Sequence, residues 1–301
     1  MDLKKKWLKI FNKKKYVEYK NKKVEDKNKY LYENKIKKSL DEISIALKKE
    51  EINFLHSGHL GDAINALPLI KEISKTKKCN YYIEANKTLP NHILDSHHPF
   101  GNVYLNNKSV DMLLPLIKSQ KFIKNSEKYS NQPIDINLNV FREFPLNFNI
   151  DSVRWYFHLT GIHANLNETY IEVNHHNDFS NKIIIARSLR RKNYLINYKF
   201  LNKYKNTLFL GMENEYLDLK NEITNLEFYD CKDFLEMAMI MKNCKIFIGN
   251  LSFGFALAEA MKIPRLLESG PDFPLVYPNG KNGYDFYFQR HFEKLFEKIY
   301  N

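Results

Sequence analysis

The 301-residue sequence lacks the features that mark secreted and membrane-spanning proteins. Its three cysteines, Cys79, Cys231 and Cys244, lie far apart and form no Cys-x-x-Cys pair, which argues against a disulfide framework or a zinc site and fits a reducing compartment. The chain has no apolar run of about 18 residues, the length that spans a bilayer. Its first residues also lack the apolar core and cleavage site of a signal peptide. The sequence therefore predicts a cytoplasmic protein.

Two site motifs are also absent. Gly-x-Gly-x-x-Gly does not occur, which argues against a dinucleotide oxidoreductase. No acidic Asp-x-Asp motif is present either, so we expect no metal site. His97 and His98 form a pair in a polar loop, but no carboxylate completes a standard ligand spacing around them. We therefore expect these histidines to be exposed.

The chain has instead a strong excess of positive charge. Lysine and arginine number 47 against 35 acidic residues, which gives a net charge of +12. Residues 1–50 are dense in lysine and predict a basic helical extension, with an amphipathic pattern at 36–49. Its apolar cluster of Trp7, Leu8, Ile10 and Phe11 fits three interpretations: an anchor on the anionic inner face of a membrane, a solvated extension, or a helix packed on the main body. Nucleic acid is not an expected partner because no recognised binding module accompanies the charge.

The rest of the chain predicts two α/β domains. Apolar strand patterns alternate with amphipathic helix patterns from residue 51 onward, and the length suffices for two cores. A polar break at 174–181 separates a first domain, 51–175, from a second domain, 176–285. An amphipathic helix at 286–301 closes the chain.

The first candidate site follows the first strand. An apolar strand ends at a turn that contains Gly58, His59 and Gly61, and an amphipathic helix follows. Such a turn allows close backbone approach, and the first N–H groups of the helix attract polar or anionic ligands. Asp62 lies in the first helical turn, where it is either a capping acid or a functional carboxylate.

Basic residues follow two later strands. Arg142 comes after the alternating strand at 134–139 and is either a ligand-binding residue or part of a surface ion pair. The strand at 182–186 runs directly into Arg187, Arg190 and Lys192. Because ligands gather at the carboxyl ends of parallel strands, and arginine pairs phosphate oxygens bidentately, we expect a phosphate site there. A solvated basic loop is the alternative.

A second strand–turn–helix unit spans residues 244–268. The strand is followed by a turn at residues 249–252, which contains Asn250, and Ser252 is a suitable N-cap for a helix that starts near Phe253. This helix N-terminus and the Arg187 loop are expected to form the two sides of a diphosphate site. Glu259 lies among alanines two turns into the helix, where a carboxylate needs a partner, either a ribose diol or an ion pair.

Together the two units resemble the heptosyltransferase-like GT-B glycosyltransferases of the ADP-heptose:lipopolysaccharide type. The first match is Ser57-Gly-His-Leu-Gly-Asp62 followed by Ala66-Leu-Pro68, and the second is the strand, Gly249-Asn250, Ser252, Gly254 and an alanine-rich helix before Pro264. The family's usual Asp and His flanking the second motif's glycine are here Asn250 and Phe255. That difference leaves the identity of the sugar open.

The resemblance implies two Rossmann-like domains whose parallel sheets face a cleft, and a final helix that crosses back to the first domain. It further implies transfer of a sugar from a nucleotide diphosphate sugar to a hydroxyl of a glycan or lipid-linked acceptor, without a metal or other cofactor. Asp62 would be the general base. The alternatives are a non-catalytic sugar-nucleotide binding protein and a charge-driven membrane-surface or nucleic-acid binding module. The implied substrate-binding set is Gly58, His59, Gly61, Arg142, Arg187, Arg190, Lys192, Asn250, Ser252, Gly254 and Glu259.

Overall fold

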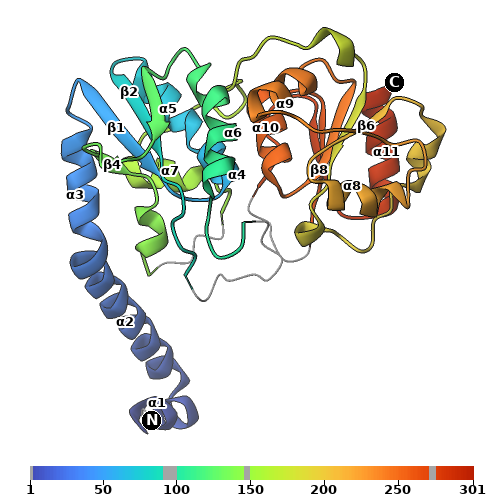
Figure 1. The fold of residues 1–301 in the computed structure, drawn as a ribbon. Coiled ribbons are helices and arrows are strands. Elements are labelled where there is room, and N and C mark those ends of the chain that lie inside the picture. Colours follow the sequence, from blue (N-terminus) through green and yellow to red (C-terminus); the bar gives the residue numbers. More distant parts are fainter. Residues whose placement is uncertain (1–2, 91–99, 146–149, 271–275) are drawn as a thin grey trace.

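The computed structural model describes residues 3–90, 100–145, 150–270 and 276–301, so the predicted exposed pair His97 and His98 lies outside the described residues. Two α/β lobes lie side by side, and a helical arm projects from the first (Figure 1). Every strand pairing within the two sheets is parallel. The prediction of an α/β fold with two parallel sheets is confirmed.

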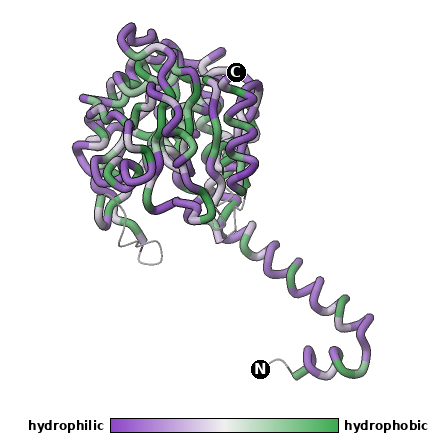
Figure 2. Tube along the Cα trace, turned by 90° about the vertical axis from the view of Figure 1, so that its right-hand side faces the viewer, coloured by the Kyte–Doolittle hydropathy of each residue, from purple (hydrophilic) through white to green (hydrophobic). Residues whose placement is uncertain are grey.

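The arm and the helix that joins it to the body contain four helical segments, α1 (Leu3–Phe11), α2 (Lys13–Leu31), a π-helical turn (Tyr32–Ile36) and α3 (Lys37–Ala46). No residue of α2 is buried, whereas α3 buries Ile43 and Ala46 and packs against α7. Figure 2 shows α1 and α2 extending away from the body. No helix in the described ranges is long and apolar enough to cross a membrane.

The first sheet has the strand order β3-β2-β1-β4. Pro68 lies at the start of α5, where its missing N–H costs nothing, and the chain is divided there into α4 and α5. The helix after the sheet ends at Gly161, which has the left-handed φ of +69° expected of a C-terminal glycine. The elements are β1 (Glu51–His56), α4 (Leu60–Asn65), α5 (Leu67–Ser74), β2 (Lys78–Ile83), α6 (Asn107–Lys118), β3 (Asn125–Lys128), β4 (Ile136–Asn137), a 3₁₀ turn (Val140–Glu143) and α7 (Arg154–Thr160).

The second sheet has the strand order β10-β9-β8-β5-β6-β7. Its central strands β5 and β8 are buried along their whole length, as expected of parallel strands covered on both faces. The strands are β5 (Ile183–Ala186), β6 (Thr207–Leu210), β7 (Glu227–Tyr229), β8 (Ile246–Asn250), β9 (Arg265–Glu268) and β10 (Gly283–Phe286). The helices are α8 (Glu213–Lys220), α9 (Phe234–Met241), α10 (Phe253–Met261) and α11 (Gln289–Tyr300), with 3₁₀ turns at Asn177–Phe179, Leu189–Arg191 and Lys199–Lys203.

The final helix does not cross back to the first domain, so this expectation is corrected. Helix α11 packs against β9 and β10 of the second sheet. Phe292 and Phe296 are fully buried in the core of the second domain, where Phe292 stacks on Phe286 at 4.1 Å between ring centroids. The apolar side of the helix is therefore already covered by its own domain.

The two domains meet through helices. Helix α4 packs against α10, and α6 packs against α9. Main-chain hydrogen bonds cross the same boundary, from the N–H groups of Tyr170 and Ile171 to the carbonyl oxygen of Ala260 at 2.9 and 3.3 Å. One continuous apolar cluster includes Phe54 of the first sheet and Phe247 of the second. The carboxyl ends of β1 and β8 therefore lead into helices that touch one another.

The burial of α11 makes a stability prediction. Phe292→Ala should lower the free energy of unfolding by about 3–5 kcal/mol, because it removes a fully buried ring and leaves a cavity. Phe288→Ala is the matched control, since that ring is 54% exposed, and it should change stability by less than about 1 kcal/mol. Chemical denaturation followed by circular dichroism measures both. Equal effects of the two substitutions would contradict the packing of α11.

Candidate functional site

A buried histidine, His56, fixes the turn after β1 through hydrogen bonds. The backbone N–H of Gly58 donates to Nδ1 of His56 at 3.1 Å, so the imidazole proton is on Nε2. Nε2 then donates to the Tyr156 hydroxyl at 3.0 Å, and that hydroxyl donates to the main-chain carbonyl of Asp62 at 2.9 Å. Burial, followed by the charge of Arg142, lowers the pKa of His56 to about 3. A neutral histidine thus fixes the backbone on both sides of the turn.

Asp62 is both a capping acid and an ion-pair partner. Its carboxylate accepts the main-chain N–H of His59 at 3.3 Å, in a capping box at the start of α4. The same oxygen accepts a hydrogen bond from Arg142. Burial raises the pKa of Asp62, but Arg142, with His59 and His56, outweighs this effect and holds the pKa below its usual value. The carboxylate is charged and only 15% exposed.

Arg142 lies among aromatic rings that orient its guanidinium. Its Cζ is 4.6 Å from the centroid of Phe141, 5.4 Å from Tyr104 and 6.0 Å from Trp155. Nη1 donates to the side chain of Asn139 at 3.2 Å. Arg142 therefore forms an ion pair, as one interpretation predicts. Because this pair lies at the carboxyl end of the sheet, where ligands gather, Arg142 is also a candidate ligand-binding residue.

The glycines of the first motif have different roles. A Cβ on Gly58 would lie 2.8 Å from Nη2 of Arg142 and 2.8 Å from Cε1 of His56, so only glycine permits this approach. A Cβ on Gly61 would lie 3.7 Å from Cβ of Ala256 in α10, an ordinary contact that shows how closely the two motif helices approach. The hydroxyl of Ser57 is buried with no hydrogen-bond partner among the described residues. His59 caps α4 and packs its ring 5.0 Å from Tyr104.

Arg187 is a structural residue, which corrects the expectation that it faces a phosphate. Its side chain is 2% exposed. Its Nε and Nη2 donate to the buried carboxylate of Glu268 at 2.7 and 2.9 Å. Glu268 also accepts from the Tyr198 hydroxyl at 2.8 Å and from the main-chain N–H of Asn193 at 2.6 Å. This network ties the basic loop to β9.

The other basic residues of the loop lie nearer the surface. Arg190 is partly exposed, in the 3₁₀ turn after β5, and its charge acts on Glu215. Lys192 donates to Asp218 of α8 at 2.8 Å. These two cations thus remain at the sheet edge where the sequence predicts them, although Lys192 is paired with an acid of its own domain.

Asn250 and Ser252 shape the second motif. The Asn250 side chain bridges the main chain of Ser188, accepting its N–H at 2.9 Å and donating to its carbonyl at 2.7 Å. Ser252 has N-cap geometry, with φ −149° and ψ 175°, and its hydroxyl donates to the Asn250 carbonyl at 3.2 Å rather than capping α10. Asn250 therefore joins the ends of β5 and β8, which brings the basic loop beside the start of α10.

Two further predicted residues serve packing rather than an open site. Glu259 accepts from Arg265 Nε at 2.5 Å and also pairs with Lys262, so its partner is an ion pair instead of a ribose. A Cβ on Gly254 would lie 2.8 Å from Cβ of Ala186, which makes glycine necessary for contact between α10 and β5.

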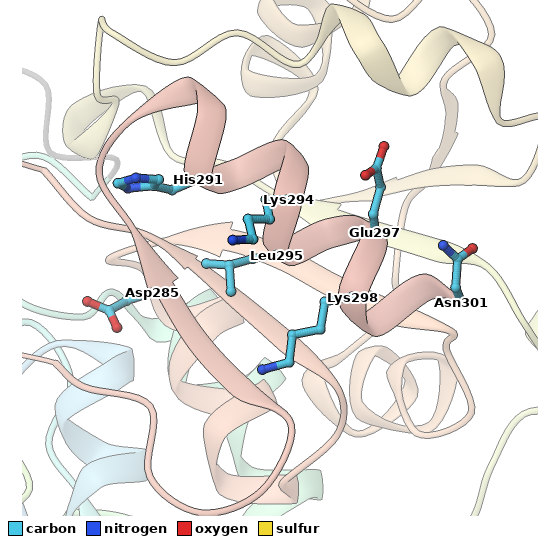
Figure 3. Close-up of a pocket in the computed structure, with 7 residues that line it drawn as sticks. All are labelled: Asp285, His291, Lys294, Leu295, Glu297, Lys298 and Asn301. Atoms are coloured by element: carbon cyan, nitrogen blue, oxygen red, sulfur yellow. The ribbon is translucent and has the colours of Figure 1, made fainter.

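A surface depression lies elsewhere in the described structure. It is bordered by β10 and α11 and lined by Asp285, His291, Lys294, Leu295, Glu297, Lys298 and Asn301 (Figure 3). None of the predicted site residues lines it. Within the described ranges, His, Cys, Asp and Glu side chains form no group of three or more that could hold a metal ion.

Neither a scan against protein-family models nor a search of curated proteins gives a match. Solved structures do match. A glycosyl transferase family 9 protein from Veillonella parvula has a TM-score of 0.55 at 11% identity, covering 85% of this chain and 91% of its own. E. coli ADP-heptose lipopolysaccharide heptosyltransferase II has a TM-score of 0.53 at 9% identity, with 83% and 98% coverage. The iron-containing dodecameric heptosyltransferase TibC of enterotoxigenic E. coli, in complex with ADP-D-β-D-heptose, has a TM-score of 0.50 at 13% identity, with 77% and 62% coverage.

The chain has the heptosyltransferase-like GT-B fold. The predicted resemblance is confirmed at this level, and the two motifs lie at the carboxyl ends of β1 and β8, which lead into the contacting helices α4 and α10. Sequence reasoning missed the residues that support the motifs, His56, Tyr156, Tyr198 and Glu268. The ring of Tyr156 is buried in the core, and nothing in the local sequence indicates the bond from its hydroxyl.

The buried pair in this GT-B fold makes a first prediction. Glu268→Gln should lower the free energy of unfolding by about 3–5 kcal/mol, because it removes the carboxylate hydrogen-bonded to the buried Arg187 and leaves only Glu222, at 3.6 Å, to balance its charge. Glu227→Gln is the control: Glu227 pairs with Lys182 but is 53% exposed, and its loss should cost less than about 1 kcal/mol. Urea denaturation compares the two. A Glu268 variant as stable as the control would contradict the structural role of Arg187.

The buried His56 makes a second prediction. Its folded-state pKa of about 3 lies below the usual 6.5, so unfolding takes up a proton between these values. Stability should therefore fall as the pH falls from 6.5 toward 3, by up to about 1.4 kcal/mol per pH unit from this group. His56→Gln should be less stable at pH 7, but its free energy of unfolding should depend less on pH over this range. Tyr156→Phe keeps the imidazole and should keep the pH dependence of the wild-type chain. Denaturant titrations at several pH values test this, and an unchanged slope in the Gln variant would contradict it.

Proposed function

We propose that the chain is a glycosyltransferase that moves a sugar from a nucleotide diphosphate sugar to an acceptor hydroxyl in surface glycan synthesis, in the cytoplasm. The observation that carries this proposal is the charged Asp62 at the start of α4, held at the carboxyl end of β1 where α4 meets α10. The TibC structure of similar fold, which contains ADP-D-β-D-heptose, supports a sugar nucleotide as the donor. A glycan or lipid-linked glycan is the proposed acceptor.

Asp62 is proposed to accept the proton of the acceptor hydroxyl as the oxygen attacks the anomeric carbon. Its pairing with Arg142 holds its pKa low, which makes it a weak base in the free protein. An anionic group of the acceptor or donor that binds Arg142 would share the guanidinium charge. The pKa of Asp62 would then rise, so ligand binding itself strengthens the base.

The leaving diphosphate needs positive charge, for which the second domain has two sources. Arg190 and Lys192 lie in the loop after β5, and Asn250 holds this loop beside the first turn of α10. The first N–H groups of α10 and these cations are suited to oxygen atoms of a diphosphate. We therefore propose that transfer needs no added metal, and full turnover in the presence of EDTA tests this.

The Asp62–Arg142 ion pair also favours a second candidate, a sugar-nucleotide binding protein without turnover. In that case the carboxylate would serve only to cap α4 and hold Arg142. The two candidates predict the same binding but differ in whether Asp62 is needed for chemistry.

A thermal-shift screen against nucleoside diphosphates and nucleotide sugars identifies the donor, because a ligand of the folded state raises the melting temperature. Arg190→Gln should weaken that shift, whereas the exposed Arg290→Gln on α11 should not. With the donor known, Asp62→Asn should keep the shift and lose at least about 100-fold in turnover, since the general base is removed. Binding with no turnover in the wild-type chain, across acceptors, would favour the second candidate; a panel without any shift would overturn both.

A further inference from the structure

The tip of the helical arm has an exposed apolar face. Leu3, Trp7, Ile10 and Phe11 of α1 are 75%, 58%, 73% and 67% exposed. Their spacing of four, seven and eight residues from Leu3 places them on one side of the helix. Leu8 lies on another side and is buried, and α1 packs against α2. The packing within the arm therefore leaves this apolar face uncovered.

The charge of the protein is concentrated in the same segment. Residues 1–31 contain 12 lysines and four acidic residues, a net charge of +8 out of +12 for the whole chain. Lys4, Lys5, Lys6 and Lys9 are interleaved with the apolar residues of α1. Exposed apolar and aromatic side chains flanked by lysines are suited to the boundary between acyl chains and anionic headgroups. A nucleic acid would match the charge but would leave the apolar face in water.

The geometry of the arm places this tip toward one end of the first domain. Helix α3 leads into β1 through residues 47–50, and the two elements run in opposite directions in Figure 1. The amino-terminal end of α3, from which the arm continues, therefore lies toward the carboxyl end of β1 and the Asp62 turn. The 19 residues of α2, none of them buried, extend the arm by about 28 Å in that direction (Figure 1).

We propose that α1 and α2 form a membrane-docking arm, in which the Leu3–Phe11 helix lies in the interface of an anionic bilayer and α2 holds the body above it. The apolar face enters the headgroup region, and the surrounding lysines pair with anionic lipids. Docking orients the carboxyl end of the first sheet toward the lipid. The inference stands apart from the proposed reaction, because docking needs no substrate.

The test is vesicle binding by the full chain. Flotation with phosphatidylcholine vesicles that contain phosphatidylglycerol should carry the protein upward, and pure phosphatidylcholine vesicles should carry much less. Trp7→Ser/Ile10→Ser/Phe11→Ser should reduce partitioning at least about tenfold for each side chain removed. Leu217→Ser/Phe288→Ser removes exposed apolar side chains from the second domain and should leave partitioning unchanged. Added salt should weaken binding.

A spectroscopic readout places the tip in the lipid. In a Trp155→Phe background Trp7 is the single tryptophan, and its emission should move to shorter wavelength on addition of anionic vesicles. The proposal would be overturned if the triple α1 variant and the double control variant lost vesicle binding equally, or if the wild-type chain did not bind vesicles. Binding to heparin or duplex DNA without binding to vesicles would also overturn the proposal. The same holds if the chain self-associates instead of binding vesicles and the α1 substitutions abolish that self-association.

Discussion

The contact between Asp62 and Arg142 determines much of the local structure around the first motif. It joins the turn after β1 to the segment after β4, two parts of the chain 80 residues apart. Gly58 must be glycine because the guanidinium and His56 leave no room for a Cβ. Phe141, Tyr104 and Trp155 surround the arginine, and His56 stays neutral because burial, and then the charge of this cation, lowers its pKa. A single ion pair thus explains a glycine, a histidine and three aromatic residues.

In the second domain, a different ion pair holds the loop that follows the central strand β5. Arg187 holds this basic loop in place, because the guanidinium donates hydrogen bonds to the buried carboxylate of Glu268. Asn250 then fixes the loop to the end of β8 through the main chain of Ser188. Burying a charge is costly unless it is paired, so the pair is retained where it positions the loop. Arg190 and Lys192 are left at the edge as a consequence of that arrangement.

The sequence was sufficient to predict the elements that carry strong patterns. The apolar strand at 182–186 and the strand–turn–helix unit at 244–268 are local signals, and the structure contains both. The edge strand β3 (Asn125–Lys128) was missed because its residues are polar and its only support is pairing with β2. The role of Arg187 was mistaken for a related reason, since its partner Glu268 is 81 residues away and only the folded sheet brings them together. Contacts between distant segments leave little trace in local composition.

The same reasoning joins the arm to the site. Charge and aromatic content alone left the first 50 residues open to several interpretations, because a solvated extension and a membrane anchor have similar composition. The structure adds the direction of the arm. Because α3 and β1 run in opposite directions, the arm leaves the body toward the carboxyl end of the first sheet, where Asp62 lies. An enzyme acting on a lipid-linked acceptor would need this orientation, whereas a solvated extension could leave the body from any side. The proposed docking of the arm would thus bring the Asp62 end of the first sheet toward a membrane-borne acceptor.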